Sequence, residues 1–142
     1  MCRVVMDLNG KARQKMTLIL IIDHHDEFRR TTGRFLEIQN NGVQVIEAAD
    51  AASGIRLALE KKPEIILLDV ELPDMNGIEA ARQIKAGLAE TRIIVLTVFE
   101  VGRFKRLYDN KDIADFISKD EIYERLLPSI RKVISESNPL GA

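Results

Sequence analysis

Hydrophobic residues along this chain fall into short, uninterrupted runs that predict buried β-strands. The strongest runs span 18–22, 65–68 and 93–96, and each is rich in β-branched residues. Two weaker candidates span 43–48 and 113–118. Apolar runs of this length are typical of strands that are buried on both faces, and such strands occur mostly in parallel sheets. We therefore expect five parallel strands.

The segments between the runs carry hydrophobic residues at helical spacing, so that each segment has one apolar face. The pattern predicts five helices, around 28–36, 55–59, 78–88, 102–109 and 122–134. The fourth of these is short and poorly patterned. The last has the clearest stripe, but Pro128 lies inside it and lacks a backbone donor, so a kink or a break is expected there.

Strands that alternate with helices predict an α/β fold. The right-handed crossover rule leaves few topologies, and we expect a flavodoxin-like, doubly wound, five-stranded parallel sheet with strand order 2-1-3-4-5 and five helices. We assign residues 17–137 to this domain. Residues 1–16 are interpreted as a loosely held N-terminal extension without an assigned element or function, and 138–142 as a C-terminal tail.

In doubly wound sheets, ligands bind beyond the carboxyl ends of the strands. Polar residues follow four of the predicted strands directly, namely Asp23, Asp69, Thr97 and Lys119. Any one of them could be a polar residue where a strand emerges into water. Two carboxylates, a hydroxyl and an ammonium that converge on one edge of a sheet indicate a functional site.

This set of groups suits phosphoryl transfer. Two neighbouring carboxylates repel each other, which favours binding of a divalent cation between them. A carboxylate beside a metal can act as a nucleophile on phosphorus and form an acyl phosphate. A lysine and a threonine hydroxyl can then stabilise the phosphoryl oxygens.

Composition and charge exclude several other classes of protein. The 142 residues carry 21 basic and 22 acidic side chains, a net charge of −1, so no electrostatic footprint for nucleic acid or an anionic membrane is present. The apolar run at 18–22 is far too short for a spanning helix. A single cysteine, Cys2, excludes an internal disulfide and suits a reducing compartment, so we expect a cytoplasmic protein.

Four stretches of the sequence together resemble the receiver domains of two-component response regulators. They are LILIID at 18–23, IILLDVELPDMNG at 65–77, IIVLT at 93–97 and FISK at 116–119, and the resemblance covers roughly 17–135. It implies that Asp69 is the phosphorylated residue and that Asp23 is an acid of a Mg²⁺ site. It also implies that the backbone carbonyl of Glu71 is a further metal ligand.

The same resemblance assigns the residues that sense the phosphoryl group. Thr97 would supply a hydroxyl that moves toward the phosphoryl group, and Lys119 would form a salt bridge with it. Phe116, three residues before the lysine, occupies the place of the aromatic switch residue.

The sequence departs from the family pattern at His24. Receivers usually have a second acid here, and that acid is a direct Mg²⁺ ligand. Imidazole is a poor ligand for Mg²⁺. Three interpretations follow, in order of preference: His24 points to solvent and water completes the metal shell, the site binds Mg²⁺ weakly or accepts a softer metal, or the domain has become independent of phosphorylation. No role is assigned to His25.

The leading hypothesis is a signalling switch that is phosphorylated by a sensor histidine kinase or a phosphotransfer protein. Such a domain catalyses only its own phosphorylation and dephosphorylation and is not a turnover enzyme. Its output partner or output domain is unidentified. The face formed by the fourth helix, the fifth strand and the fifth helix is expected to contact that partner, and it is also the face for a homodimer.

Two alternative functions would be indicated by other sequence features. The first is a pseudo-receiver that serves as a phosphorylation-independent interaction module, and His24 is the feature in its favour. The second is an enzyme, either of the flavodoxin kind or a phosphatase of the haloacid dehalogenase kind. Residues 23–27 offer mostly carboxylates where a flavin phosphate needs bare donors. They also lack the second aspartate, two residues after the first, that such a phosphatase requires.

Overall fold

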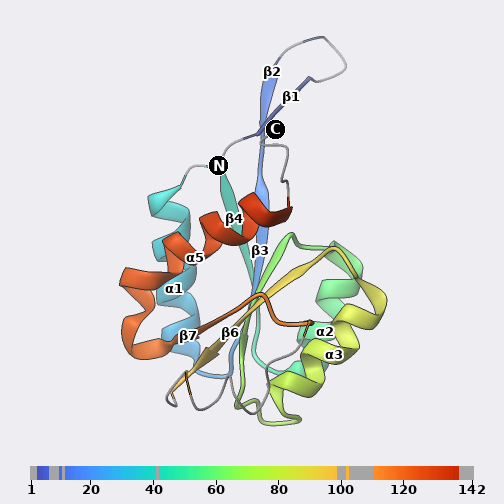
Figure 1. Cartoon of the computed structure of the whole chain (residues 1–142), viewed down its shortest axis with the longest axis vertical. Coiled ribbons are helices and arrows are strands. Elements are labelled where there is room, and N and C mark those ends of the chain that lie inside the picture. The colour runs from blue at the N-terminus through green and yellow to red at the C-terminus, as the bar shows by residue number, and fades with distance from the viewer. Residues whose placement is uncertain are drawn as a thin grey trace.

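The computed structural model describes residues 3–6, 10, 12–40, 42–98, 102 and 111–137. Five strands form one parallel sheet (Figure 1), and their order in space is β4-β3-β5-β6-β7. Counted along the chain within this sheet, the order is 2-1-3-4-5, so the predicted topology is confirmed. The strands are β3 (Thr17–Ile22), β4 (Val43–Ala48), β5 (Ile65–Asp69), β6 (Arg92–Thr97) and β7 (Asp115–Ser118).

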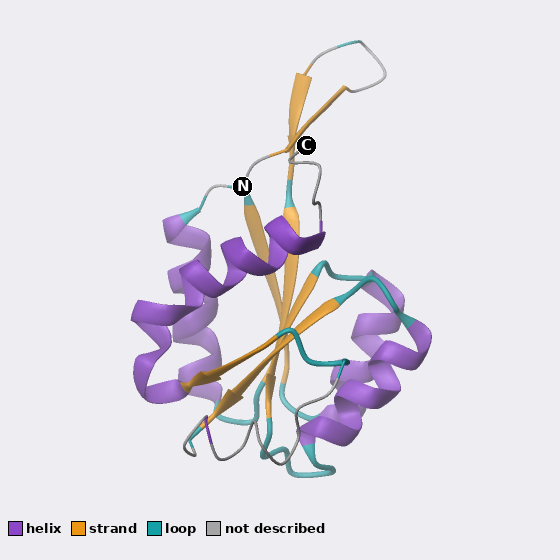
Figure 2. Cartoon of the chain, in the orientation of Figure 1, coloured by secondary structure: helices purple, strands orange, loops and turns teal. Residues whose placement is uncertain are grey.

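Helices cover both faces of the sheet, as expected for a doubly wound fold. In Figure 1, α1 and α5 lie on one side and α2 and α3 on the other, and Figure 2 shows the same layers by type of element. The helices are α1 (Asp26–Gln39), α2 (Ala51–Lys61), α3 (Gly77–Gly87) and α5 (Ile122–Ser137), with a short 3₁₀ turn, η1 (Lys119–Glu121), before α5. Apart from Gly102, the helix expected around 102–109 lies outside the described residues.

The sheet divides the core into two apolar layers. Residues 19–22 and 65–68 are at most 1% exposed, because alternate side chains of each strand enter opposite layers. One layer packs against α2 and α3 and contains Phe116 of β7. The other packs against α1 and α5. Burial on both faces is the physical reason why these strands appear in the sequence as continuous apolar runs.

Of the kink or break expected at Pro128, the break is absent, because α5 continues through this residue; the kink stays a prediction. Pro128 is exposed, while Leu126, Ile130 and Val133 are buried against the sheet. Packing of this apolar stripe stabilises the helix on both sides of the missing backbone donor, and tertiary packing thus overrides local propensity.

The N-terminal extension contains two strands that the sequence analysis did not assign. β1 (Arg3–Met6) pairs antiparallel with β2 (Ala12–Lys15). Gly10 lies between them with φ of 79°, a left-handed conformation that glycine adopts readily. Asn-Gly, which stands at 9–10, is a strong signal for a tight hairpin. Figure 1 shows the pair extending away from the sheet, with β2 leading into β3.

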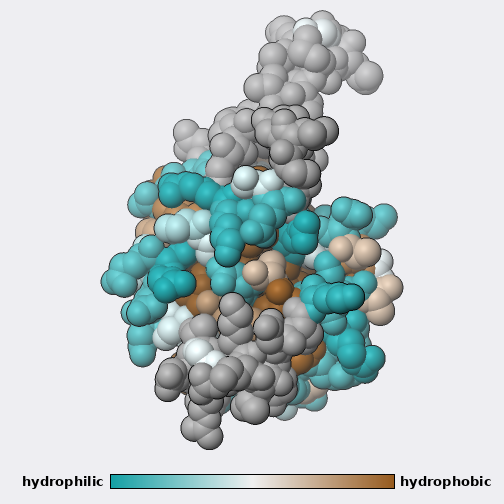
Figure 3. Space-filling view, in the orientation of Figure 1, coloured by the Kyte–Doolittle hydropathy of each residue, from teal (hydrophilic) through white to brown (hydrophobic). Residues whose placement is uncertain are grey.

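Hydrophilic residues cover most of the face drawn in Figure 3, outside the grey region. No helix among the described residues combines the length and the apolar character needed to cross a bilayer.

Packing of α2 against β3 leaves no room for a side chain at Gly54. A Cβ atom there would lie 2.5 Å from Ile22 Cδ1 and 2.7 Å from Ile22 Cγ1. We predict that Gly54→Ala lowers the free energy of unfolding by about 1–3 kcal/mol, because overpacking outweighs the gain in helix propensity. Urea denaturation measures this change.

The matched control is Gly33→Ala in α1. There the nearest atom to a new Cβ is Val45 Cγ1 at 3.1 Å, so a small adjustment suffices. Much of the helix-propensity gain of about 1 kcal/mol should be retained at this position. Equal stability changes for the two variants would contradict this account of α2 packing.

Candidate functional site

Parallel pairing brings the ends of four strands to one edge of the sheet. Asp69 pairs with Leu96, one residue before Thr97, and Thr97 pairs with Ser118, one residue before Lys119. Ile22, just before Asp23, pairs with Leu68. The four polar residues predicted from the sequence therefore lie on adjacent strand ends. Lys119 contacts both Asp23 and Asp69 directly.

The Lys119 ammonium lies between the two carboxylates. Its Nζ is 2.7 Å from Asp23 Oδ2 and 3.2 Å from Asp69 Oδ2. The same ammonium lies 4.5 Å from the ring centre of Phe28, a cation–π contact from α1. The Lys119 side chain is only 9% exposed. Lys119 is therefore not simply a polar residue at a point where a strand emerges into water.

Asp69 is held in a buried position that opposes its ionisation. The residue is 3% exposed. Burial raises the pKa of this carboxyl, and repulsion from Asp23 raises it further. Attraction to Lys119 and the backbone N–H of Glu71, which donates to Asp69 Oδ1 at 3.1 Å, act in the opposite direction. The net effect is a raised pKa.

Asp23 is fully buried, and its backbone is clamped by Arg29 of α1. Arg29 Nη1 donates to the Asp23 carbonyl oxygen at 2.7 Å. Arg29 Nε donates to Glu47 of β4 at 2.9 Å, and Nη2 pairs with Asp26 at 2.9 Å. One buried guanidinium thus joins the loop after β3 to a helix and to the neighbouring strand, which positions the Asp23 side chain.

The loop after Asp69 is closed by a bridge between Glu71 and Asn76. Asn76 caps α3, because its side chain accepts from Ile78 N–H at 2.7 Å. Gly77 N–H donates to the Val70 carbonyl at 2.8 Å. A Cβ at Gly77 would collide with the carbonyl oxygen of Asp69. Only glycine permits this close approach of backbone to backbone, so Gly77 positions the Asp69 loop.

The same loop also caps α2 through Asp74. This exposed carboxylate accepts from Ala51 N–H and Ala52 N–H, each at 2.9 Å. These hydrogen bonds lower the pKa of Asp74. Asp50, the residue before α2, accepts from Ser53 N–H at 2.7 Å. Donors at the start of α2 are therefore satisfied in part by a residue 22 or 23 positions away, a contact without a local sequence signal.

His25, and not His24, joins the carboxylates. His25 Nδ1 lies 3.1 Å from Asp23 Oδ1, 3.6 Å from Asp69 Oδ2 and 3.4 Å from Lys119 Nζ. Ligand atoms of Asp23, His25 and Asp69 all lie within 4.8 Å of one another. His24 is exposed, its ring centre is 4.6 Å from that of His25, and it is not part of this group.

Thr97 and Phe116 are buried near this edge. Thr97 ends β6 and is 1% exposed, and Phe116 is 4% exposed in the layer that faces α2 and α3. Their switching roles, and the role of the Glu71 carbonyl as a metal ligand, stay predictions.

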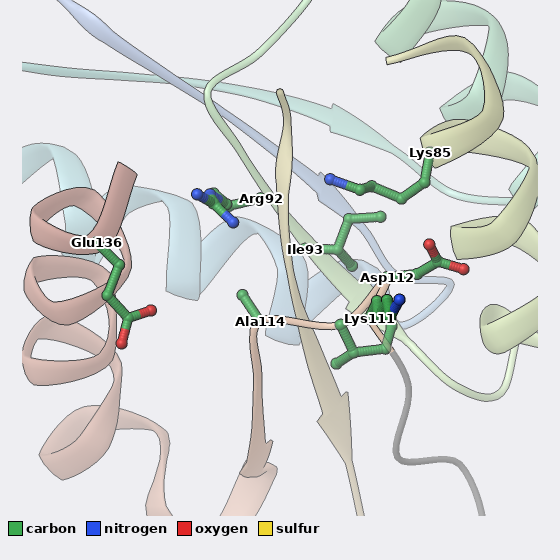
Figure 4. A pocket seen from close by; sticks show the side chains of 8 residues that line it. Lys85, Arg92, Ile93, Lys111, Asp112, Ala114 and Glu136 are labelled. Atoms are coloured by element: carbon green, nitrogen blue, oxygen red, sulfur yellow. The ribbon is translucent and has the colours of Figure 1, made fainter. Parts of the chain in front are cut away.

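A second hollow lies at the opposite end of the sheet (Figure 4). It is lined by charged side chains of both signs, from Lys85, Arg92, Lys111, Asp112 and Glu136. Lys85 Nζ already donates to the carbonyls of Ala89 and Thr91, each at 2.7 Å. Burial lowers the pKa of Lys85, and the charge of Arg92 adds to this effect. We assign no ligand to this hollow.

Replacing Arg29 tests the clamp on the Asp23 loop. Arg29→Met leaves the buried Asp23 carbonyl without its donor, and we predict a loss of about 1–3 kcal/mol in the free energy of unfolding. Arg125→Met is the control, because Arg125 is an exposed helix residue in an ion pair with Glu121. It should change stability by less than about 1 kcal/mol. Urea denaturation measures both changes. Similar losses of unfolding free energy in the two variants would show that Arg29 does not stabilise the Asp23 loop.

The raised pKa of Asp69 predicts a pH dependence of stability. The pKa of Asp69 in the folded protein lies above its ordinary value of 3.8, so the folded protein holds this proton more tightly than the unfolded chain does. Stability contributed by protonated Asp69 is therefore lost as pH rises through the folded pKa. Compared with wild type at each pH, Asp69→Asn should become relatively more stable from acidic to neutral pH.

The Asp74→Asn variant should show the opposite pH dependence of stability. Because the folded pKa of Asp74 is lowered, its carboxylate contributes stability that is lost as pH falls through that pKa. Asp74→Asn should therefore become relatively less stable from acidic to neutral pH. Parallel behaviour of the two variants in urea denaturation would show that the two carboxyls are not perturbed in opposite directions.

Comparison with known proteins agrees with this geometry. Residues 19–131 match the response regulator receiver domain family. The chain is 31% identical over 121 residues to response regulator GacA of Pseudomonas aeruginosa, a match that covers 84% of this chain and 56% of GacA. It is 43% identical over 84 residues to transcriptional regulatory protein LiaR of Bacillus subtilis, covering 59% of this chain and 40% of LiaR.

A solved structure is similar over most of the domain. The crystal structure of a two-component response regulator of the LuxR family from Aurantimonas sp. SI85-9A1 has a TM-score of 0.79 at 28% identity, covering 86% of this chain and 87% of that one. The chain spans about half the length of the curated relatives it matches. Receiver domains are signalling switches rather than turnover enzymes. Since the family match covers residues 19–131, which contain nearly all of the five-stranded sheet, this chain belongs to the response regulator receiver domains of two-component systems.

Proposed function

We propose that this domain is a phospho-acceptor switch in which Asp69 receives a phosphoryl group from a sensor histidine kinase or a phosphotransfer protein. The observation that carries the proposal is the contact of the buried Asp23 and Asp69 carboxylates with Lys119. In this proposal Asp69 is the nucleophile, Asp23 is the second acid and Lys119 is the cation, and their proximity at one edge of the sheet supports phosphoryl transfer.

The proposed reaction transfers a phosphoryl group from a histidine nitrogen of the donor to a carboxylate oxygen of Asp69. A carboxylate oxygen of Asp69 forms a bond to phosphorus while the bond to the donor histidine nitrogen breaks, and that nitrogen keeps the electron pair. Lys119 stabilises the negative charge on the phosphoryl oxygens. Asp69 is only 3% exposed, so the donor needs side chains at this edge to move. His25, whose side chain is 53% exposed and lies beside both carboxylates, is suited to this movement.

A divalent cation completes the site in this proposal. The oxygen donors of Asp23 and Asp69 fit Mg²⁺, and the Glu71 carbonyl would be a third oxygen ligand. When bound, the cation neutralises phosphoryl oxygens. His24, at the place of the family's second acid, points its side chain to solvent and offers no ligand atom to the cluster. This agrees with the part of our first interpretation in which His24 points to solvent and takes no part in the site.

In this proposal, the change caused by phosphorylation of Asp69 is passed on through Lys119 and its neighbours to a binding face. Thr97 and Lys119 respond to the phosphoryl group, Phe116 adjusts with them, and the face that includes β7 and α5 binds the output partner or a second copy. A phosphorylation-independent pseudo-receiver is not favoured. His24 is its main support, whereas the buried groups that phosphoryl chemistry needs are in contact.

The test is phosphate mapping after treatment with a small phosphodonor and Mg²⁺. Wild type should gain one phosphoryl group in its intact mass, and peptide mapping should place it on Asp69. Asp69→Ala should gain none. Asp74→Ala is the matched control, because it removes an exposed acid from the same loop and should still be labelled. Unlabelled wild type, or labelling that persists in Asp69→Ala, would overturn the proposed function.

A further inference from the structure

We infer that His25 Nδ1 is a direct ligand of the cation held between Asp23 and Asp69. We further infer that this nitrogen makes the site select first-row transition cations, such as Mn²⁺ and Co²⁺, over Mg²⁺. The inference deepens the proposed function, since it names the cation that serves the Asp69 site.

Distances between the candidate ligand atoms fit one metal ion. Two ligands about 2.1 Å from a metal are about 3.0 Å apart at a right angle and about 3.4 Å apart at a tetrahedral angle. His25 Nδ1 lies 3.1 Å from Asp23 Oδ1 and 3.6 Å from Asp69 Oδ2. The ligand atoms of Asp23 and Asp69 lie within 4.8 Å of each other. A movement of the side chains by about an ångström would therefore bring one nitrogen and two oxygens around a single ion.

The negative charge of the two carboxylates at this edge of the sheet also favours binding of a cation. Asp23 is 0% exposed, and Lys119 Nζ, at 2.7 Å, is the partner of its Oδ2. Two carboxylates share this one ammonium. If both are ionised, one negative charge remains uncompensated in a desolvated place, which is costly unless a second cation binds.

The position of the His25 ring follows from the local backbone. His25 is the cap residue of α1, with φ −85° and ψ 100°, and its N–H donates to Asp23 Oδ1 at 2.8 Å. This turn, in which a side chain accepts from the N–H two residues on, folds the chain back on Asp23. The imidazole is thereby directed toward the carboxylates, with Nδ1 3.1 Å from Asp23 Oδ1.

Nitrogen at this position changes which cations are preferred. Mg²⁺ is a hard cation that favours oxygen ligands, whereas Mn²⁺, Co²⁺ and Ni²⁺ accept imidazole with affinities that rise along that series. A softer metal was one interpretation of His24 from the sequence. We now assign the preference for a softer metal to His25, because His24 offers no ligand atom to the cluster.

Pulsed electron paramagnetic resonance of bound Mn²⁺ tests the ligand directly. The full chain and the variants His25→Asn and His24→Asn are each loaded with Mn²⁺. Modulation from a directly coordinated nitrogen should be present in wild type and in His24→Asn and absent in His25→Asn. Bound Mn²⁺ without nitrogen modulation in wild type, or modulation that persists in His25→Asn, would overturn the inference.

Calorimetric titration tests the selectivity. His25→Asn should weaken Co²⁺ binding by about tenfold or more, while Mg²⁺ binding changes by less than about twofold. His24→Asn should change neither affinity. Equal losses for the two cations in His25→Asn would assign His25 a structural role and reject the inference.

Phosphate mapping keeps this inference separate from the proposed function. Nitrogen coupling in a protein that takes no phosphate on Asp69 with any of these cations would support the ligand and reject the switch. Labelling of Asp69 without nitrogen coupling would support the switch and reject the ligand.

Discussion

Burial of two like charges at the end of an apolar sheet is the constraint on which the rest of the site depends. Asp23 and Asp69 are 0% and 3% exposed. Ionised groups in such places are unstable without compensation. Lys119 supplies part of it, and parallel strand register brings Lys119 within reach. The Arg29 clamp and the close approach at Gly77 keep the two acids in place while they repel each other.

The sheet and its principal polar residues could be predicted because both follow from strand burial. A strand buried on both faces appears as an unbroken apolar run, and the run ends where the strand reaches the edge of the core. Parallel pairing aligns these ends, so Asp23, Asp69, Thr97 and Lys119 could be placed together without coordinates. The strand order followed from the same pattern and was confirmed.

Other contacts could not be predicted because side-chain direction decides them. His24 and His25 are adjacent and chemically identical, yet only His25 turns back to the carboxylates, through a hydrogen bond at the start of α1. Asp74 satisfies donors of α2 across 22 or 23 residues of sequence, and Arg29 reaches Glu47 across 18. The strands of the N-terminal extension carried one usable signal, the Asn-Gly pair before β2.

The place of Lys119 in the chain has a mechanical consequence. Lys119 is the first residue of the 3₁₀ turn that leads directly into α5, a helix of 16 residues. At about 1.5 Å per residue, this helix is a rod about 24 Å long. One end of the rod is attached to the ammonium that holds both acids. In the proposed switch, a phosphoryl group that displaces this ammonium would act on one end of the rod, and the rod offers a path along the length of the domain.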